Sequence, residues 1–108
     1  MTEKEKNKIL IRAINTYGQT SQLNMAIEEM AELTKAICKL KRAIGITEYS
    51  TAVGNIIEEM ADVQIMLDQL KIIFKSDAKA LAAVEHIKLH RLEKRLDKFD
   101  KMKEADEQ

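Results

Sequence analysis

Two copies of one short acidic pattern constrain the fold of this chain more than any other feature. The segment Ile-Glu-Glu-Met-Ala-Glu-Leu at residues 27–33 returns thirty residues later as Ile-Glu-Glu-Met-Ala-Asp-Val at residues 57–63. Apolar residues recur in and around each copy at intervals of three and four, which is the period of an amphipathic helix. Gly45 lies midway between the copies, so a chain that reverses direction there places them level with each other. The repeat therefore predicts two antiparallel helices with their acidic residues at the same height.

The rest of the chain also favours helices. The sequence has no proline and only three glycines, and aromatic residues make up 4% of it, so strand-forming clusters are scarce. We expect a short first helix over residues 9–17 that ends at Gly18, since glycine suits the left-handed cap at a helix C-terminus. Thr20 or Ser21 can then cap a second helix, which Gly45 ends.

Two further helices are expected after this turn. Thr47 or Ser50 offers a cap for the third helix, and Ser76 or Asp77 opens the fourth. The charged end at residues 101–108 is expected to fray. The two middle helices should face the core with apolar stripes, made up of Leu23, Ile27, Met30, Leu33, Thr34 and Ile37 in the second and of Val53, Ile57, Met60, Val63, Leu67 and Leu70 in the third.

Length and charge bound the class of protein. A chain of 108 residues has the size of one domain, and we predict a single all-α domain over residues 1–108, an antiparallel bundle of about four helices with its core over residues 9–99. The 18 basic and 18 acidic residues cancel, so no global field draws the chain to nucleic acid or to an anionic membrane. Cys38 is the only cysteine, and no apolar run reaches the length of a membrane span, which together favour a cytoplasmic protein.

The acidic residues of the repeat are spaced for joint action. Glu29 and Glu32 lie three residues apart on one side of their helix, as do Glu59 and Asp62, whereas Glu28 lies further round toward solvent. Carboxylates about 6 Å apart repel by roughly 3 kcal/mol per pair at an effective dielectric near 20, so a converging cluster needs a cation. All-oxygen ligation suits Mg²⁺ or Mn²⁺ rather than zinc. The alternative, in which the bundle splays the pairs apart as solvated surface, stays open.

The spacing Glu28-Glu29-x-x-Glu32 followed by Glu59-x-x-Asp62 resembles the EExxE…ExxD signature of the MazG-like all-α nucleoside triphosphate pyrophosphohydrolases. The resemblance implies hydrolysis between the α and β phosphates, which gives a nucleoside monophosphate and pyrophosphate and would suit housecleaning of the nucleotide pool. It implies Glu29, Glu32, Glu59 and Asp62 as ligands of catalytic Mg²⁺, with Mn²⁺ as a substitute. Glu28 would hold a further metal through water or act as the catalytic base.

Basic residues for the substrate phosphates are expected on the fourth helix. Lys88, Arg91 and Arg95 share one face there, and the resemblance favours Lys88 and Arg91 as phosphate-binding residues. A solvated face is the equally weighted alternative. Lys35 and Lys39 follow the first acidic pair and are interpreted as helix-surface charge.

Apolar residues off the main stripes indicate that the chain needs a partner. Leu40, Met66 and Ile73 are examples, and they predict a homodimer, with a homotetramer as the alternative. The other partner expected is a nucleoside triphosphate substrate, with no nucleic acid and no membrane. A competing hypothesis is a non-enzymatic helical interaction module that oligomerises through its apolar stripes, with the repeated acids as mere surface.

Overall fold

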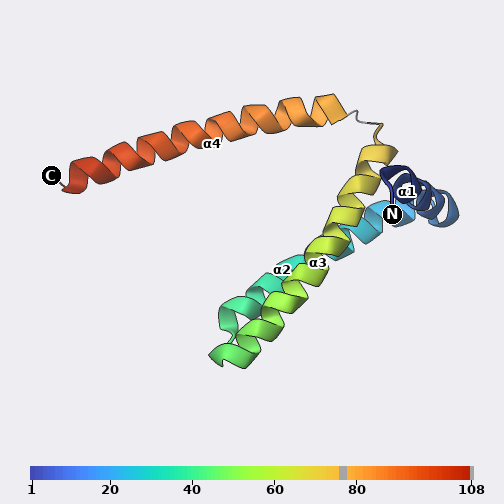
Figure 1. Cartoon of the computed structure of the whole chain (residues 1–108), viewed down its shortest axis with the longest axis horizontal. Helices are drawn as coiled ribbons and strands as arrows, with labels where there is room; N and C mark the ends of the chain where they lie inside the picture. The colour runs from blue at the N-terminus through green and yellow to red at the C-terminus, as the bar shows by residue number, and fades with distance from the viewer. Residues whose placement is uncertain (76–77, 108) are drawn as a thin grey trace. The chain divides into compact units, whose positions relative to one another are not determined.

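The protein is all-α in the computed structural model, which describes residues 1–75 and 78–107. The chain runs through α1 (Glu3–Tyr17), α2 (Gln19–Arg42), α3 (Gly45–Ile73) and α4 (Ala78–Glu107), as Figure 1 shows. The described residues contain no strand, so the predicted fold class is confirmed. Helices α1 to α3 form one compact unit, and α4 belongs to a second.

Helix α1 begins earlier than the apolar pattern indicated. The Thr2 hydroxyl accepts a 3.1 Å hydrogen bond from the backbone N–H of Glu5, and the Glu5 carboxylate accepts one of 3.4 Å from the backbone N–H of Thr2. This reciprocal pair is a capping box, which satisfies N–H groups that a helix start leaves free. The polar segment before residue 9 is therefore helical, and α1 starts at Glu3.

The cap predicted for α2 is wrong. Gly18 separates α1 from α2 with a φ of +91°, and α2 begins directly after it at Gln19. Thr20 and Ser21 consequently lie inside the first turn, and no side chain caps this helix. One glycine, in a conformation that other residues rarely adopt, takes the place of a longer loop.

The cap predicted for α3 is also wrong. Helix α2 ends at Arg42, and α3 begins at Gly45, so Thr47 and Ser50 lie within α3. At the start of α3 the Glu48 carboxylate accepts a 2.9 Å hydrogen bond from the backbone N–H of Ile44. The reversal itself falls at Ala43 and Ile44, directly before the midpoint of the repeat at Gly45, and α2 and α3 lie side by side in opposite directions (Figure 1).

The contact between α2 and α3 runs along a seam that shares Leu33, Val63 and Leu70 with the predicted apolar stripes but otherwise differs from them. The buried and half-buried side chains of this contact recur at alternating spacings of four and three residues, as in a two-stranded coiled coil. Along this spacing they are Gln22, Ala26, Glu29, Leu33, Ala36 and Leu40 on α2, and Ala52, Ile56, Glu59, Val63, Met66 and Leu70 on α3, and Leu23, Val53 and Gln69 lie beside them. Small alanine side chains let the two backbones approach closely, and one glutamate from each helix falls within the seam.

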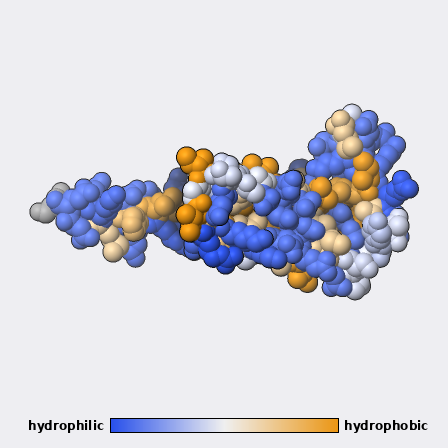
Figure 2. Space-filling view, turned by 90° about the horizontal axis from the view of Figure 1, so that it is seen from below, coloured by the Kyte–Doolittle hydropathy of each residue, from blue (hydrophilic) through white to orange (hydrophobic). Residues whose placement is uncertain are grey.

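Much of the predicted stripe lies at the surface instead. Ile27 is 66% exposed and Ile57 is 61% exposed, whereas the buried apolar residues of the described chain are Leu10, Ala26, Ala36, Ala52 and Met66. Apolar side chains are visible at the surface in the space-filling view of Figure 2. The three-helix unit thus buries little apolar surface against itself.

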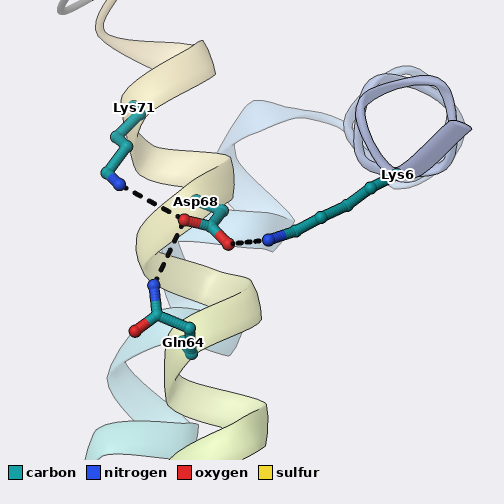
Figure 3. A network of polar contacts seen from close by, with 4 residues as sticks. All are labelled: Lys6, Gln64, Asp68 and Lys71. Carbon is teal, nitrogen blue, oxygen red and sulfur yellow. Dashed lines mark hydrogen bonds and ion pairs between the residues drawn. The ribbon is translucent and has the colours of Figure 1, made fainter. Parts of the chain in front are cut away.

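A polar network fastens α1 to α3 (Figure 3). The Lys6 Nζ lies 2.7 Å from Asp68 Oδ2, and Asp68 Oδ1 accepts hydrogen bonds from Gln64 at 3.2 Å and Lys71 at 3.3 Å. Burial by itself would raise the pKa of Asp68, but the hydrogen bonds from its partners outweigh it and lower the pKa. The carboxylate at this junction is therefore held in its charged form.

Helix α4 is continuous to Glu107, so the fraying expected beyond residue 101 is not seen as far as the structure describes the chain. Its expected start at Ser76 or Asp77 lies outside the described residues. None of its residues is buried. Of the helices described, none combines the length and apolar character needed to span a membrane.

Candidate metal centre and the adjoining groove

Three of the four predicted ligands meet at the middle of the α2–α3 seam. Glu29 of α2 and Glu59 and Asp62 of α3 each offer a carboxylate oxygen, and these oxygens lie within 4.8 Å of one another. Glu29 and Glu59 are half-buried because they occupy seam positions, while Asp62 is exposed at the edge. The antiparallel register inferred from the repeat thus brings acids of both copies into one cluster.

The cluster is electrostatically uncompensated. Burial raises the pKa of Glu29, and the neighbouring charges of Asp62, Glu59 and Glu32 raise it further. Glu59 Oε2 is buried, and within the described residues it has no hydrogen-bond partner. A buried carboxylate oxygen without a partner is costly, so this site attracts either a proton or a cation.

The remaining predicted residues of the acidic pattern lie outside this trio. Glu32 is exposed and stands on α2 beside the seam position held by Leu33, and it faces the space next to Glu59 rather than joining the three oxygens. Glu28 is exposed and takes no part in the cluster. The acid at the end of the first EExxE pattern is thus set apart from the other three.

The donor set fits a hard divalent cation. Three carboxylates supply oxygen ligands, which are the ligands that Mg²⁺ prefers, and Mg²⁺ usually keeps several waters or takes substrate phosphate oxygens in its other positions. Zinc sites in proteins commonly contain histidine or cysteine, and this cluster contains neither. Glu29, Glu59 and Asp62 are thus the residues that could hold Mg²⁺ or Mn²⁺.

A groove continues from the acidic cluster toward the α2–α3 turn. Its inner part, of about 120 Å³, is lined by Glu32, Lys35 and Glu59 among others. Its outer part, of about 390 Å³, extends to Arg42 and Thr47. Lys39, Ala52 and Asn55 line both parts, so the two hollows adjoin, and together they are called the groove.

Sequence reasoning undervalued the basic side of this groove. Lys35, Lys39 and Arg42 recur at i, i+4 and i+7 after the first acidic pair, a spacing that places them on one face of α2. All three line the groove, and no carboxylate lies within ion-pair distance of them in the part of the chain that the structure describes. The spacing was the available signal, and only the position of α3 shows that this face borders a groove.

The basic residues predicted on the fourth helix are exposed on α4. Lys88, Arg91 and Arg95 lie there as expected from their spacing. His86 and His90 stack on the same helix with ring centroids 6.5 Å apart, and His90 Nδ1 lies 3.6 Å from a Glu93 carboxylate oxygen.

No protein-family model, curated protein or solved structure matches this chain. The chemistry of the cluster and the groove is therefore the basis for a functional inference.

Proposed function

We propose that this protein is a Mg²⁺-dependent nucleoside triphosphate pyrophosphohydrolase of the MazG-like type, with Mn²⁺ as a substitute for Mg²⁺. The observation that carries the proposal is the convergence of Glu29, Glu59 and Asp62 from two antiparallel helices, with oxygens within 4.8 Å of one another. The raised pKa of Glu29 and the unpartnered Glu59 Oε2 support it, because both features favour a bound cation.

In the proposed reaction a water oxygen bonds to the α phosphorus, and the bond from that phosphorus to the oxygen bridging to the β phosphorus breaks. The bridging oxygen leaves on pyrophosphate, and the water proton passes to a carboxylate, for which Glu28 is the proposed base, and then to solvent. Bound Mg²⁺ supplies charge neutralisation and orientation for the phosphates. Glu29, Glu59 and Asp62 hold it, Glu32 completes the acidic wall beside Glu59, and Lys88 and Arg91 are the proposed phosphate donors of α4.

A homodimer is part of the proposal, with a homotetramer as the alternative. Ile27 and Ile57 are more than half exposed at the surface of the three-helix unit, and a second copy of the chain would cover such side chains. A cytoplasmic location is also proposed, since Cys38 is a free thiol.

A pyrophosphate-release screen of nucleoside triphosphates with Mg²⁺ or Mn²⁺ tests the activity. Hydrolysis of at least one nucleotide is expected, and Glu59→Gln and Asp62→Asn should each abolish it while the far-ultraviolet circular dichroism spectrum stays helical. Glu58→Gln is the matched control, because Glu58 is exposed and lies outside the cluster. Wild-type rates in Glu59→Gln would refute the assignment of the metal site.

The second candidate is a non-enzymatic helical interaction module. The extent of exposed apolar surface on α2 and α3, including Met60 at 56%, favours a protein that works by binding other helices. Metal dependence separates the two candidates. If neither Mg²⁺ nor Mn²⁺ raises the melting temperature and no nucleotide releases pyrophosphate, the interaction module is the better description.

A further inference from the structure

The groove beside the acidic cluster has a composition that the metal centre does not explain. Its α2 wall carries Lys35, Lys39 and Arg42, and its α3 wall carries two hydroxyls and one amide, from Thr47, Thr51 and Asn55. We call these six residues the basic arm. An open cavity of this size is in the range that small ligands occupy, and every polar group of the basic arm can donate a hydrogen bond.

The basic arm begins where the acidic cluster ends. Glu59 lines the inner part of the groove, and Thr47 lines the outer part twelve residues earlier on α3, which is about 18 Å at 1.5 Å per residue. The groove therefore leads from the candidate metal ligands into a region of positive charge. A ligand suited to this groove has an anionic group beside Lys39 and Arg42 and a second one at a cation held by the acidic cluster.

One carboxylate also borders the outer part of the groove. Glu48 lines it, but its Oε2 already accepts the 2.9 Å hydrogen bond from the Ile44 backbone N–H at the start of α3. In this outer part the one engaged carboxylate faces two cations, Lys39 and Arg42, which have no ion-pair partners among the described residues, so the balance of charge there is positive. In the inner part Lys35 and Lys39 face Glu32 and Glu59, so the charges there balance.

We propose that the basic arm is a pyrophosphate subsite, which holds the β and γ phosphates of the substrate and then the leaving pyrophosphate. This inference rests on the proposed function and deepens it, because it fixes which part of the nucleotide occupies the groove. The α phosphate would lie at the divalent cation that Glu29, Glu59 and Asp62 would hold, and the β and γ phosphates would extend toward the α2–α3 turn. Arg42 suits the two oxygens of one phosphate, and Lys39, which lines both parts of the groove, acts as a point charge between the metal and Arg42.

Titration calorimetry with inorganic pyrophosphate and Mg²⁺ tests the subsite without any need for turnover. Wild-type protein should bind, and Lys39→Ala and Arg42→Ala should each weaken binding roughly tenfold or more, as expected for loss of a charge-assisted contact. Lys41→Ala is the matched control, because Lys41 lies in the same turn of α2, is exposed and does not line the groove. The rise in melting temperature caused by Mg²⁺ alone should be the same in all three variants.

The outcomes separate the subsite from the activity. If the variants lose pyrophosphate affinity but no nucleotide is hydrolysed, the proposed function fails and the subsite stands. If nucleotides are hydrolysed but Lys39→Ala and Arg42→Ala bind pyrophosphate as tightly as wild type, the subsite is overturned. It is also overturned if wild-type protein does not bind pyrophosphate, or if Lys41→Ala weakens binding as much as the groove variants do. A third contradicting result is that Lys39→Ala and Arg42→Ala keep their affinity for pyrophosphate and lose affinity only for a nucleoside without phosphates.

Discussion

Gln22 and Gln69 join α2 to α3 through a buried hydrogen bond, in which Gln22 Nε2 donates to Gln69 Oε1 at 2.7 Å. The two side chains are only 6% and 4% exposed. Gln22 precedes Glu29 by seven residues and Gln69 follows Asp62 by seven, so this bond lies one heptad from the acidic cluster on both helices. This buried polar pair lies among mostly apolar seam residues, and its hydrogen bond is made only in the register in which the acids meet.

Gln69→Leu should lower the free energy of unfolding by about 1–3 kcal/mol, because the buried Gln22 amide loses its partner. The double variant Gln22→Leu/Gln69→Leu should recover most of that loss, since neither polar group remains. Urea denaturation of both single variants and the double variant gives the coupling energy. Additive losses would show that the hydrogen bond does not couple the two helices.

Glu29→Gln should stabilise the protein when no divalent cation is present. The pKa of Glu29 is raised above 4.5, so the folded state binds more protons than the unfolded state, and stability falls as pH rises through the folded-state pKa. Removing the charge should gain on the order of 0.5–1 kcal/mol at neutral pH, or a few degrees in Tm. Thermal melts in chelator at about pH 4, where the carboxyl is mostly protonated in both states, and at about pH 7 measure this, and equal gains at both values would contradict it.

Asp68→Asn should destabilise the junction between α1 and α3. The pKa of Asp68 is lowered from 3.8, so its stabilising effect is present at neutral pH and is lost as pH falls through the folded-state pKa. The network is partly exposed, so the loss should be about 0.5–1 kcal/mol and smaller at high salt. Lys6→Ala should also lower the melting temperature, whereas Lys4→Ala, on the same helix but outside this network, should not. Equal effects of the two lysine variants would argue against the junction.

Gly18 and Gly54 should respond to alanine with opposite signs. Gly18 has a φ of +91°, which strains any residue with a Cβ, so Gly18→Ala should cost about 1–3 kcal/mol. Gly54 lies inside α3 with open space around its Cα, so Gly54→Ala should gain about 0.5–1 kcal/mol. Chemical denaturation measures both. A loss of stability in Gly54→Ala would indicate that a partner approaches α3 closely at this position.

Ile57→Lys should convert the proposed homodimer to a monomer. Ile57 is 61% exposed in one chain, and a lysine there would place a charge in the apolar contact with a second copy. Sedimentation velocity should give twice the mass of one chain for wild type and a single-chain mass for the variant. Lys41→Ala serves as a surface control. A wild-type monomer at all concentrations would exclude the dimer.

Part of this arrangement follows from the sequence alone. The repeat at residues 27–33 and 57–63 predicted both the helical periodicity and the point of reversal. The two copies lie at equal distances along the chain from residue 45, and this distance can be read from the sequence alone. The repeat therefore predicted that Glu29, Glu32, Glu59 and Asp62 would converge, and in the structure Glu29, Glu59 and Asp62 do so. Capping was predicted less well, since α2 starts directly after a glycine with positive φ and no side chain caps α2 or α3, although the local pattern favoured Ser and Thr caps.

The sequence by itself determined the helices, their antiparallel pairing and the level at which the acids lie, since these depend on local periodicity and distance along the chain. Only the tertiary structure decided which face of each helix meets the other. Close packing selected the seam with Ala26, Ala36 and Ala52 over the bulkier stripe with Ile27 and Ile57. In this seam Glu29 and Glu59 lie in the contact between α2 and α3. The sequence of one helix cannot decide this, because the packing of an interface depends on how the surfaces of both helices fit together.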